Sequence, residues 1–118
     1  MNAVHWPSEL RLSDKGRLLH VTFDDGAVFD LGAEMLRVMS PSAEVQGHSA
    51  AERKLVSGKR NVAIIEIVPT GNYAVRLVFD DMHSTGIYSW TYLYELGADA
   101  DRKWADYTAE LQAKGLTR

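Results

Sequence analysis

The stretch "NVAIIEIVPTGNYAVRLVF" (residues 61–79) is the clearest structural signal in the sequence, because it contains two apolar, β-branched runs separated by a turn. Between the runs stands the sequence Pro-Thr-Gly-Asn at 69–72. Proline cannot donate a hydrogen bond to a strand ladder, and glycine accepts the positive φ angles that tight turns require. The stretch therefore predicts an antiparallel β-hairpin with strands at 61–68 and 73–80.

A second hairpin is predicted upstream, in "RLLHVTFDDGAVFDL" (17–31). Apolar residues alternate along this stretch until an Asp-Asp-Gly sequence, which is typical of a short hairpin turn. We expect strands at 17–23 and 26–31. The preceding "ELRLS" at 9–13 is expected to add an edge strand, which ends in a Ser-Asp-Lys-Gly turn.

Three helices are predicted. A short helix at 32–39 ends at Ser40-Pro41, because a residue before proline disfavours the α conformation. A second helix spans 89–97, with Ser89 as its N-cap and Gly97 as its end. The tail, 99–114, has an apolar stripe at helical spacing, formed by Ala100, Trp104, Tyr107 and Leu111.

These elements predict an α+β fold, in which an antiparallel sheet of two hairpins is covered on one face by the tail helix. Trp104 and Leu111 are expected to be buried beneath that helix. The stretches "HVTFDDGAVFDLGAEML" and "VRLVFDDMHSTGIYSWTYL" both follow the order strand, Phe-Asp-Asp, turn, strand, helix. They suggest a ββα pseudo-repeat, although this order also recurs by chance in α+β proteins.

Composition limits the kinds of function. A length of 118 residues with 46% hydrophobic content fits one domain over 1–118. The net charge of -3 argues against nucleic acid as a partner. The chain has no cysteine, which excludes a disulfide, a thiolate nucleophile and a Cys-ligated metal within it. We see no secretory leader or membrane span, so we expect a cytoplasmic protein that does not enter a membrane.

The stretch "FDDMHSTGIYSW" (79–90) is the main candidate site, because it gathers two carboxylates, a histidine and hydroxyl groups around one glycine. His83 has three interpretations: a structural turn residue, a partner or ligand contact, or a metal ligand together with His48 and a carboxylate. Carboxylates for that purpose are Glu44, Asp80 and Asp81. The two aspartates are also expected to cap the turn by accepting backbone N–H bonds.

Two further groups have structural and functional interpretations. The aromatic residues Tyr88, Trp90, Tyr92 and Tyr94 are expected to pack in the core, or to form an interaction patch where a ring is exposed. The basic pair Lys59-Arg60 precedes a strand, where it is either solvated or in contact with an anion or an acidic partner.

Three stretches carry a resemblance to a known family: "LRVMSPSAEVQGH", "SGKRNVAIIEIVPTGNYAVRLVFDD" and "HSTGIYSWTYLYELG". Together they resemble the gamma-butyrobetaine hydroxylase-like N-terminal domains, from about Leu10 to Leu96. In that family the domain occurs alone in bacteria, precedes the oxygenase domain of gamma-butyrobetaine and trimethyllysine hydroxylases, or is appended to P-loop ATPases with iron–sulfur clusters.

The resemblance implies a zinc site that this sequence does not retain. In the hydroxylases three cysteines and a histidine hold a structural zinc ion, and a Leu-Arg pair precedes the cysteines. The Leu-Arg pair falls on Leu36 and Arg37, and the histidine falls on His83. The cysteine positions are occupied by Ser40, Ser42 and Val45. Serine and valine cannot replace thiolate ligands, so we expect no cofactor, and His48 and His83 remain only weak metal candidates.

We therefore expect a non-catalytic accessory or protein-interaction module that acts in trans on another protein. Its recognition surface is predicted from the turn and the adjacent loop: His83, Asp81, Tyr88, Trp90, His48 and Ser42. The alternative is a metal-binding or oxidoreductase-linked protein connected to iron or iron–sulfur metabolism. No Ser-His-Asp or phosphate-loop signature is visible in the sequence.

Overall fold

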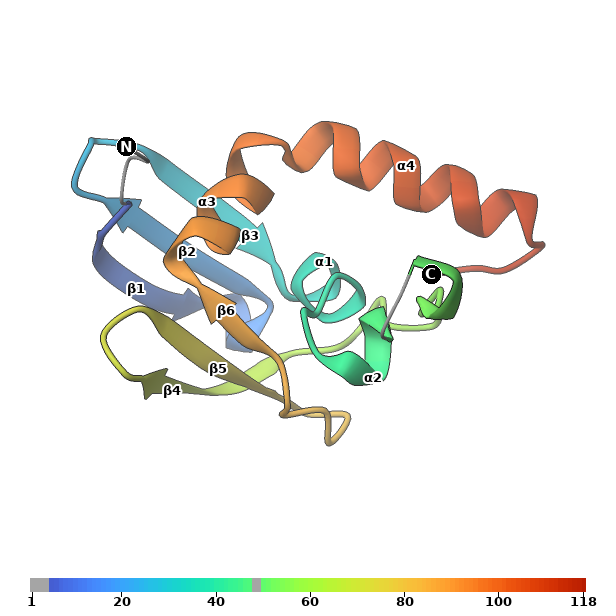
Figure 1. Cartoon of the computed structure of the whole chain (residues 1–118), viewed down its shortest axis with the longest axis horizontal. Helices are drawn as coiled ribbons and strands as arrows, with labels where there is room; N and C mark the ends of the chain where they lie inside the picture. Colours follow the sequence, from blue (N-terminus) through green and yellow to red (C-terminus); the bar gives the residue numbers. More distant parts are fainter. Residues whose placement is uncertain (1–4, 48–49) are drawn as a thin grey trace.

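The computed structural model describes residues 5–47 and 50–118 and has two three-stranded antiparallel sheets (Figure 1). The first sheet contains, in spatial order, β1 (Pro7–Ser13), β2 (Leu18–Phe23) and β3 (Val28–Gly32). The second contains β4 (Ile64–Thr70), β5 (Ala74–Phe79) and β6 (Ile87–Ser89). The predicted α+β class, both hairpins and the edge strand near 9–13 are confirmed.

Four α-helices lie in the described part of the chain: α1 (Ala33–Val38), α2 (Ala43–Gln46), α3 (Trp90–Ala98) and α4 (Ala100–Ala113). Two short 3-10 helices occupy Asp14–Gly16 and Ala50–Glu52. Three of the α-helices match the predicted ones closely. The one-turn helix α2 was not predicted, because its four residues are too few to show a periodic pattern.

The two hairpin turns form as the sequence indicates. Gly26 has a φ of 89°, and the Asp25 carboxylate accepts a hydrogen bond from the Ala27 N–H group. In the other hairpin, Pro69 still pairs with Val75 near the end of β4, and Gly71 has a φ of 57°. Glycine adopts both left-handed conformations without steric cost.

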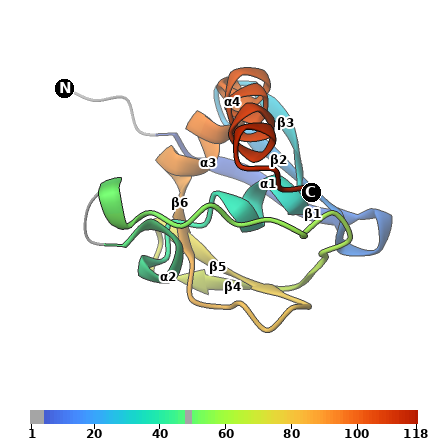
Figure 2. The same ribbon diagram turned by 90° about the vertical axis from the view of Figure 1, so that its right-hand side faces the viewer.

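The hairpins do not share one hydrogen-bonded sheet, which differs from the expected arrangement. Each hairpin adds a third strand of its own, and the apolar faces of the two sheets meet in one core. Leu19 and Val21 of the first sheet pack in this core with Val75 and Leu77 of the second. The resulting layers can be followed in Figure 2.

The predicted ββα order is present and is longer than expected. Each unit is three strands followed by a helix, since β3 leads directly into α1 and β6 leads directly into α3. Ser89 caps α3 as predicted, because its side-chain oxygen accepts a hydrogen bond from the Tyr92 N–H group.

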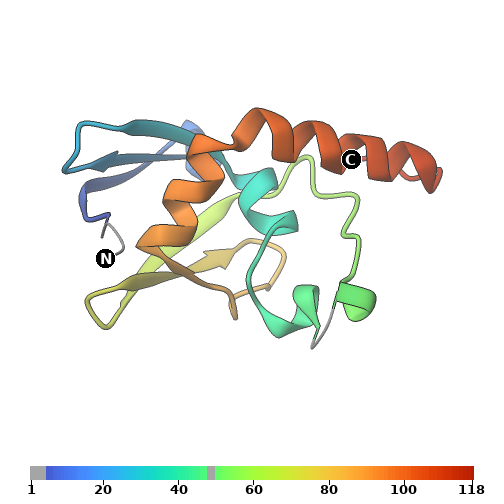
Figure 3. The same cartoon turned by 45° about the horizontal axis from the view of Figure 1, so that its top comes forward.

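Helix α4 is present, but it does not cover one face of a sheet as predicted, because its main packing neighbours are α3, α1 and the connection after α2. Tyr107 and Leu111 pack against Val38 of α1 and against residues 55–56 of the long connection after α2. Figure 3 shows this connection running beside the far half of α4. Leu111 is buried as expected, whereas Trp104 is only partly buried, so that half of the prediction was wrong. The Arg118 guanidinium lies over the Trp104 ring, 5.2 Å from its centroid.

The helix in closest contact with the first sheet is α3. Its Gly97 lies so near β3 that a Cβ atom there would be 2.3 Å from the Phe29 ring. The prediction that Gly97 ends the helix was wrong, since α3 continues to Ala98. Among residues 5–47 and 50–118, no helix has the length and apolar character needed to cross a membrane.

Candidate functional site

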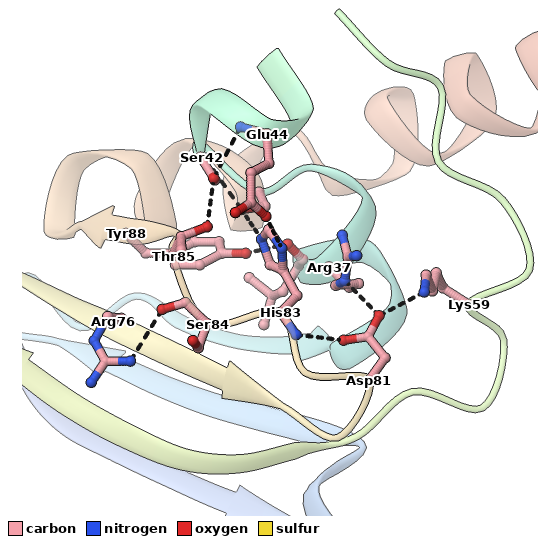
Figure 4. A network of polar contacts seen from close by, with 12 residues as sticks. Arg37, Ser42, Glu44, Lys59, Arg76, Asp81, His83, Ser84, Thr85 and Tyr88 are labelled. Atoms are coloured by element: carbon pink, nitrogen blue, oxygen red, sulfur yellow. Dashed lines mark hydrogen bonds and ion pairs between the residues drawn. The ribbon is translucent and has the colours of Figure 1, made fainter. Parts of the chain in front are cut away.

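The connection between β5 and β6, residues 80–86, packs against the segment 40–46, which contains α2 and the residues directly before it (Figure 4). The Ser40 Oγ atom lies 2.9 Å from His83 Nε2, and Ser42 Oγ lies 2.7 Å from Thr85 Oγ1. The two segments are therefore adjacent, as the resemblance implied. We refer to residues 80–86 as the β5–β6 turn.

The His83 side chain is enclosed by polar partners. Only 6% of the residue is exposed, and its Nδ1 atom lies 3.1 Å from a carboxylate oxygen of Glu44. Burial lowers the pKa of His83, and the positive charge of Arg37 lowers it further, against the opposing effect of Glu44. The ring is consequently neutral near pH 7.

A neutral ring satisfies every contact around it. Nδ1–H donates to Glu44, and Nε2 accepts the hydroxyl hydrogen of Ser40. The Ser40 oxygen in turn accepts from the Ser42 backbone N–H, at 3.2 Å. We call Ser40, Glu44 and His83, with the contact to Ser42, the His83 network.

Asp81 fixes the start of the β5–β6 turn. Its carboxylate accepts hydrogen bonds from Arg37 Nε at 2.8 Å and from the His83 backbone N–H at 3.1 Å, and it lies 2.7 Å from Lys59 Nζ. Burial alone raises the pKa of Asp81, but the contacts with Lys59, His83 and Arg37 outweigh burial and lower the pKa to about 2. The carboxylate therefore stays charged across the physiological range.

The neighbouring aspartate has the capping role that the sequence predicted. Asp80 Oδ1 accepts a hydrogen bond from the Ala63 N–H group at 3.1 Å, which ties the turn to the start of β4. At the other side of the turn, Arg76 Nη1 donates to the Ser84 carbonyl at 3.1 Å. The turn is thus attached to β5 and to the residue directly before β4.

Met82 is the residue that the fixed turn exposes. It is 89% exposed and has a φ of 76°, a left-handed conformation that a residue with a long side chain rarely adopts. The backbone is held there by Asp81 on one side, and the Met82 N–H bonds to the Phe79 carbonyl. An apolar side chain is therefore presented to solvent by a well-anchored segment.

The other predicted site residues have different positions. Tyr88 is fully buried, and its hydroxyl donates to the Leu36 carbonyl. Trp90 is partly buried at the start of α3, where Nε1 donates to the Asn72 carbonyl at 2.9 Å. His83 and Ser42 are buried as well, so these residues support the site and offer little surface to a partner. His48 lies outside the described residues.

The order Ser40, His83, Glu44 is that of a serine hydrolase triad, but the surroundings do not suit catalysis. Ser40 is fully buried. A Cβ atom on Gly86 would lie 2.4 Å from Ser40 Oγ, so the backbone of Gly86 occupies the space beside the hydroxyl. A substrate carbonyl cannot reach the oxygen in this arrangement, and the contacts hold two segments together.

The residues at the family's zinc positions do not fit a zinc ion. The hydroxyl groups of Ser40 and Ser42 are engaged in hydrogen bonds, and Val45 belongs to the buried apolar residues. Within residues 5–47 and 50–118, no three or more His, Asp or Glu side chains are grouped so that they could hold a metal ion.

Three residues contribute to the site although the sequence did not predict their roles there: Arg37, Lys59 and Met82. Arg37 had a signal, since it belongs to the Leu-Arg pair of the resemblance. Lys59 was expected to be either solvated or in contact with an anion or an acidic partner, whereas it binds Asp81 of the same chain. Met82 had no signal, because its left-handed backbone and exposure depend on the surrounding fold.

The fold and the site together define a small α+β domain of two βββα units, in which the second unit's turn is bonded to the segment after α1. The sequence profile of the family described as gamma-butyrobetaine hydroxylase-like, N-terminal, matches residues 10–94. The chain belongs to this gamma-butyrobetaine hydroxylase-like N-terminal family.

Solved structures agree with this assignment. Two NMR solution structures are 44% and 46% identical in sequence, with TM-scores of 0.85 and 0.84. They cover 98% and 100% of this chain, which in turn covers 91% and 90% of theirs. A crystal structure from Acidithiobacillus ferrooxidans is described as a DUF971 family protein with unknown function. It is 40% identical, with a TM-score of 0.65 over 78% of this chain and 92% of that one. No curated protein matches the sequence.

Proposed function

We propose that this domain is a non-catalytic accessory module that binds another protein in trans through the β5–β6 turn. The observation that carries the proposal is Met82, an exposed apolar residue in a left-handed conformation at the tip of an anchored turn. Strained residues that persist in a fold are frequent at recognition sites, because the strain is retained for function. Methionine is also a common contact residue at binding surfaces.

The anchoring supports recognition over catalysis. Arg37 and Lys59 both contact the Asp81 carboxylate, and the His83 network holds the rest of the turn. A preorganised turn loses little conformational entropy when a partner binds, which favours affinity. The reactive side chains of the site, Ser40 and His83, are buried and serve this anchoring.

A cavity of about 450 Å³ beside the turn suggests the chemistry of the partner. It is lined by Asp81 and by three basic residues: Lys59, Arg60 and Arg118. Lys59 and Arg118 have carboxylate partners within the chain, whereas Arg60 forms no ion pair within the described residues. A partner segment with an apolar pocket for Met82 and a nearby acidic side chain fits this surface best.

Affinity capture with matched variants tests the proposal. Met82→Asp places a charge at the centre of the surface, and Val28→Asp makes the same change at a residue 62% exposed in the first sheet. A protein that is retained by the wild type and by Val28→Asp, and lost with Met82→Asp, supports the proposal. Binding of that purified protein is expected to weaken at least tenfold with Met82→Asp. Equal binding by both variants contradicts it.

A further inference from the structure

A second cavity lies between α4 and residues 53–56, and none of its lining residues belongs to the β5–β6 turn. We call it the α4 cleft; its volume is about 210 Å³. Figure 3 shows the connection after α2 passing beside α4. The apolar part of its lining comes from α1, the connection, α3 and α4, and includes Val38, Met39, Leu55, Val56, Tyr92 and Tyr107.

The two tyrosines present their rings to the cleft with their hydroxyl groups already bonded. Tyr92 donates to the Met39 carbonyl at 2.5 Å, and Tyr107 donates to the Val56 carbonyl at 2.7 Å. These bonds also attach α3 and α4 to the other wall. The tyrosine rings thus give the cleft an apolar wall beside its polar lining, and the elements that form it are fixed to one another.

Charged residues line both sides of the cleft, and the basic ones outnumber the acidic ones, Asp106 and Glu110 of α4. Arg53 and Lys54 come from the connection, and Arg102 and Lys103 come from α4. Arg53 pairs with Glu110 at 2.7 Å, and Arg102 pairs with Asp99 and Asp106. Lys54 and Lys103 form no ion pair with any carboxylate of the described residues. Two ammonium groups on opposite walls are thus available to an anion.

We propose that the α4 cleft binds a small organic anion that has one carboxylate and a short apolar body. The carboxylate contacts Lys54 and Lys103 at the rim, and the apolar body contacts Met39 and the tyrosine rings. Concave sites with apolar walls and a few convergent polar groups are the usual form of small-molecule sites. This inference is independent of the protein-binding role proposed above.

The cleft also touches the segment that builds the other site. Gln46 lines the cleft and donates from its side-chain amide to the Ser40 carbonyl at 2.9 Å. Met39, in the same lining, directly precedes Ser40. A bound anion therefore contacts residues adjacent to the His83 network.

Titration with hexanoate, followed by amide chemical shifts of the isotope-labelled protein, tests the proposal. Hexanol and hexylammonium serve as probes of the same length without the negative charge. We expect saturable shifts with hexanoate at Leu55, Val56, Lys103 and Tyr107, much weaker binding of hexanol, and no saturable shifts with hexylammonium. Affinity should fall with rising salt, because the contacts are partly electrostatic.

Charge variants locate the site. Lys54→Gln combined with Lys103→Gln is expected to weaken hexanoate binding at least tenfold, with the amide spectrum of the folded protein retained. Lys15→Gln combined with Lys114→Gln removes the same charge outside the cleft and is expected to leave binding unchanged. The proposal is overturned if hexanoate causes no saturable shifts, if the shifts map elsewhere, if hexylammonium binds equally, or if both double variants bind like the wild type.

Discussion

His83 connects the two segments of the candidate site, since one ring nitrogen contacts Ser40 and the other contacts Glu44. Both partners are some 40 positions away along the chain, so the hydrogen bonds of the ring join the β5–β6 turn to the start of α2. These hydrogen bonds hold the turn in one conformation.

Replacing His83 with alanine is expected to destabilise the protein by about 1 to 3 kcal/mol, because buried polar groups of Ser40 lose their partner. Urea unfolding measures the change. Met82→Ala is the matched control, one residue away and exposed, and is expected to alter stability by less than about 0.5 kcal/mol. A loss at His83 no larger than that of the control would contradict the structural role of the ring.

Stability is expected to fall with acid in two stages. The pKa of folded His83 lies below its ordinary value of 6.5, so the unfolded chain takes up the proton first. The free energy of unfolding therefore decreases as the pH drops below about 6.5. His83→Gln should remove this stage from urea unfolding measured across pH.

The second stage comes from Asp81, whose pKa is lowered to about 2 in the folded protein. Its stabilising contribution is present above the unfolded pKa and is lost as the pH falls from about 4 to about 2, by an amount on the order of 2 kcal/mol. The difference between wild type and Asp81→Asn should shrink across this range. If the free energy of unfolding changes with pH equally in both proteins, the contacts of Asp81 do not lower its pKa.

The positions of some site residues could be predicted from the sequence, and those of others could not. The capping role of Asp80 and the position of His83 beside residues 40–46 follow from turn chemistry and from the family resemblance. The burial of Tyr88 and the exposure of Met82 do not. The burial of Tyr88 depends on which face of a three-residue strand meets the core, and so short a strand shows no readable alternation. The exposure of Met82 depends on the left-handed backbone of the turn, which the surrounding fold imposes.

At the scale of elements, the contact between α3 and β3 joins the two βββα units. Gly97 permits this contact, since its missing side chain leaves room for the Phe29 ring. The sequence showed a glycine near a helix end, where a stop signal is the usual interpretation. The packing role could not be predicted, because β3 and α3 are separated by more than 50 residues of sequence.

Gly97→Ala is expected to destabilise the protein by about 1 to 3 kcal/mol, because a Cβ atom would overlap the Phe29 ring. This outcome is opposite to the usual gain from alanine inside a helix. Gly32→Ala is the control, since a Cβ atom there has no neighbour within 4 Å and the φ angle is -71°. Thermal unfolding of both variants measures the effect, and a more stable Gly97→Ala protein would contradict the packing described.

For α4, the sequence predicted that a stripe of apolar residues is buried, but not which residues the stripe packs against. The spacing of the apolar residues in α4 indicated a buried stripe, and Leu111 is buried. The pattern could not show that Tyr107 and Leu111 meet residues 55–56, which lie in a connection without regular periodicity. The division into two sheets was also hidden, because hairpin patterns specify neighbouring strands and not how hairpins associate.

For the whole molecule, the structure gives a reason to expect that this member of the family folds without a metal ion. The apolar faces of the two sheets and the helices share one core, whose largest buried side chains include Tyr88, Phe23 and Phe79. A single core of this size can stabilise a domain without a metal ion. The serines at the family's cysteine positions then contribute hydrogen bonds where relatives are expected to use thiolates.

Thermal unfolding of the purified wild-type protein, with and without a strong chelator, shows whether the fold depends on a metal ion. We predict the same melting temperature in both samples and no rise when zinc is added, because the β5–β6 turn is held by the His83 network and by Asp81. A drop of many degrees on chelation, restored by zinc, would show that a metal ion holds the site and would contradict the account.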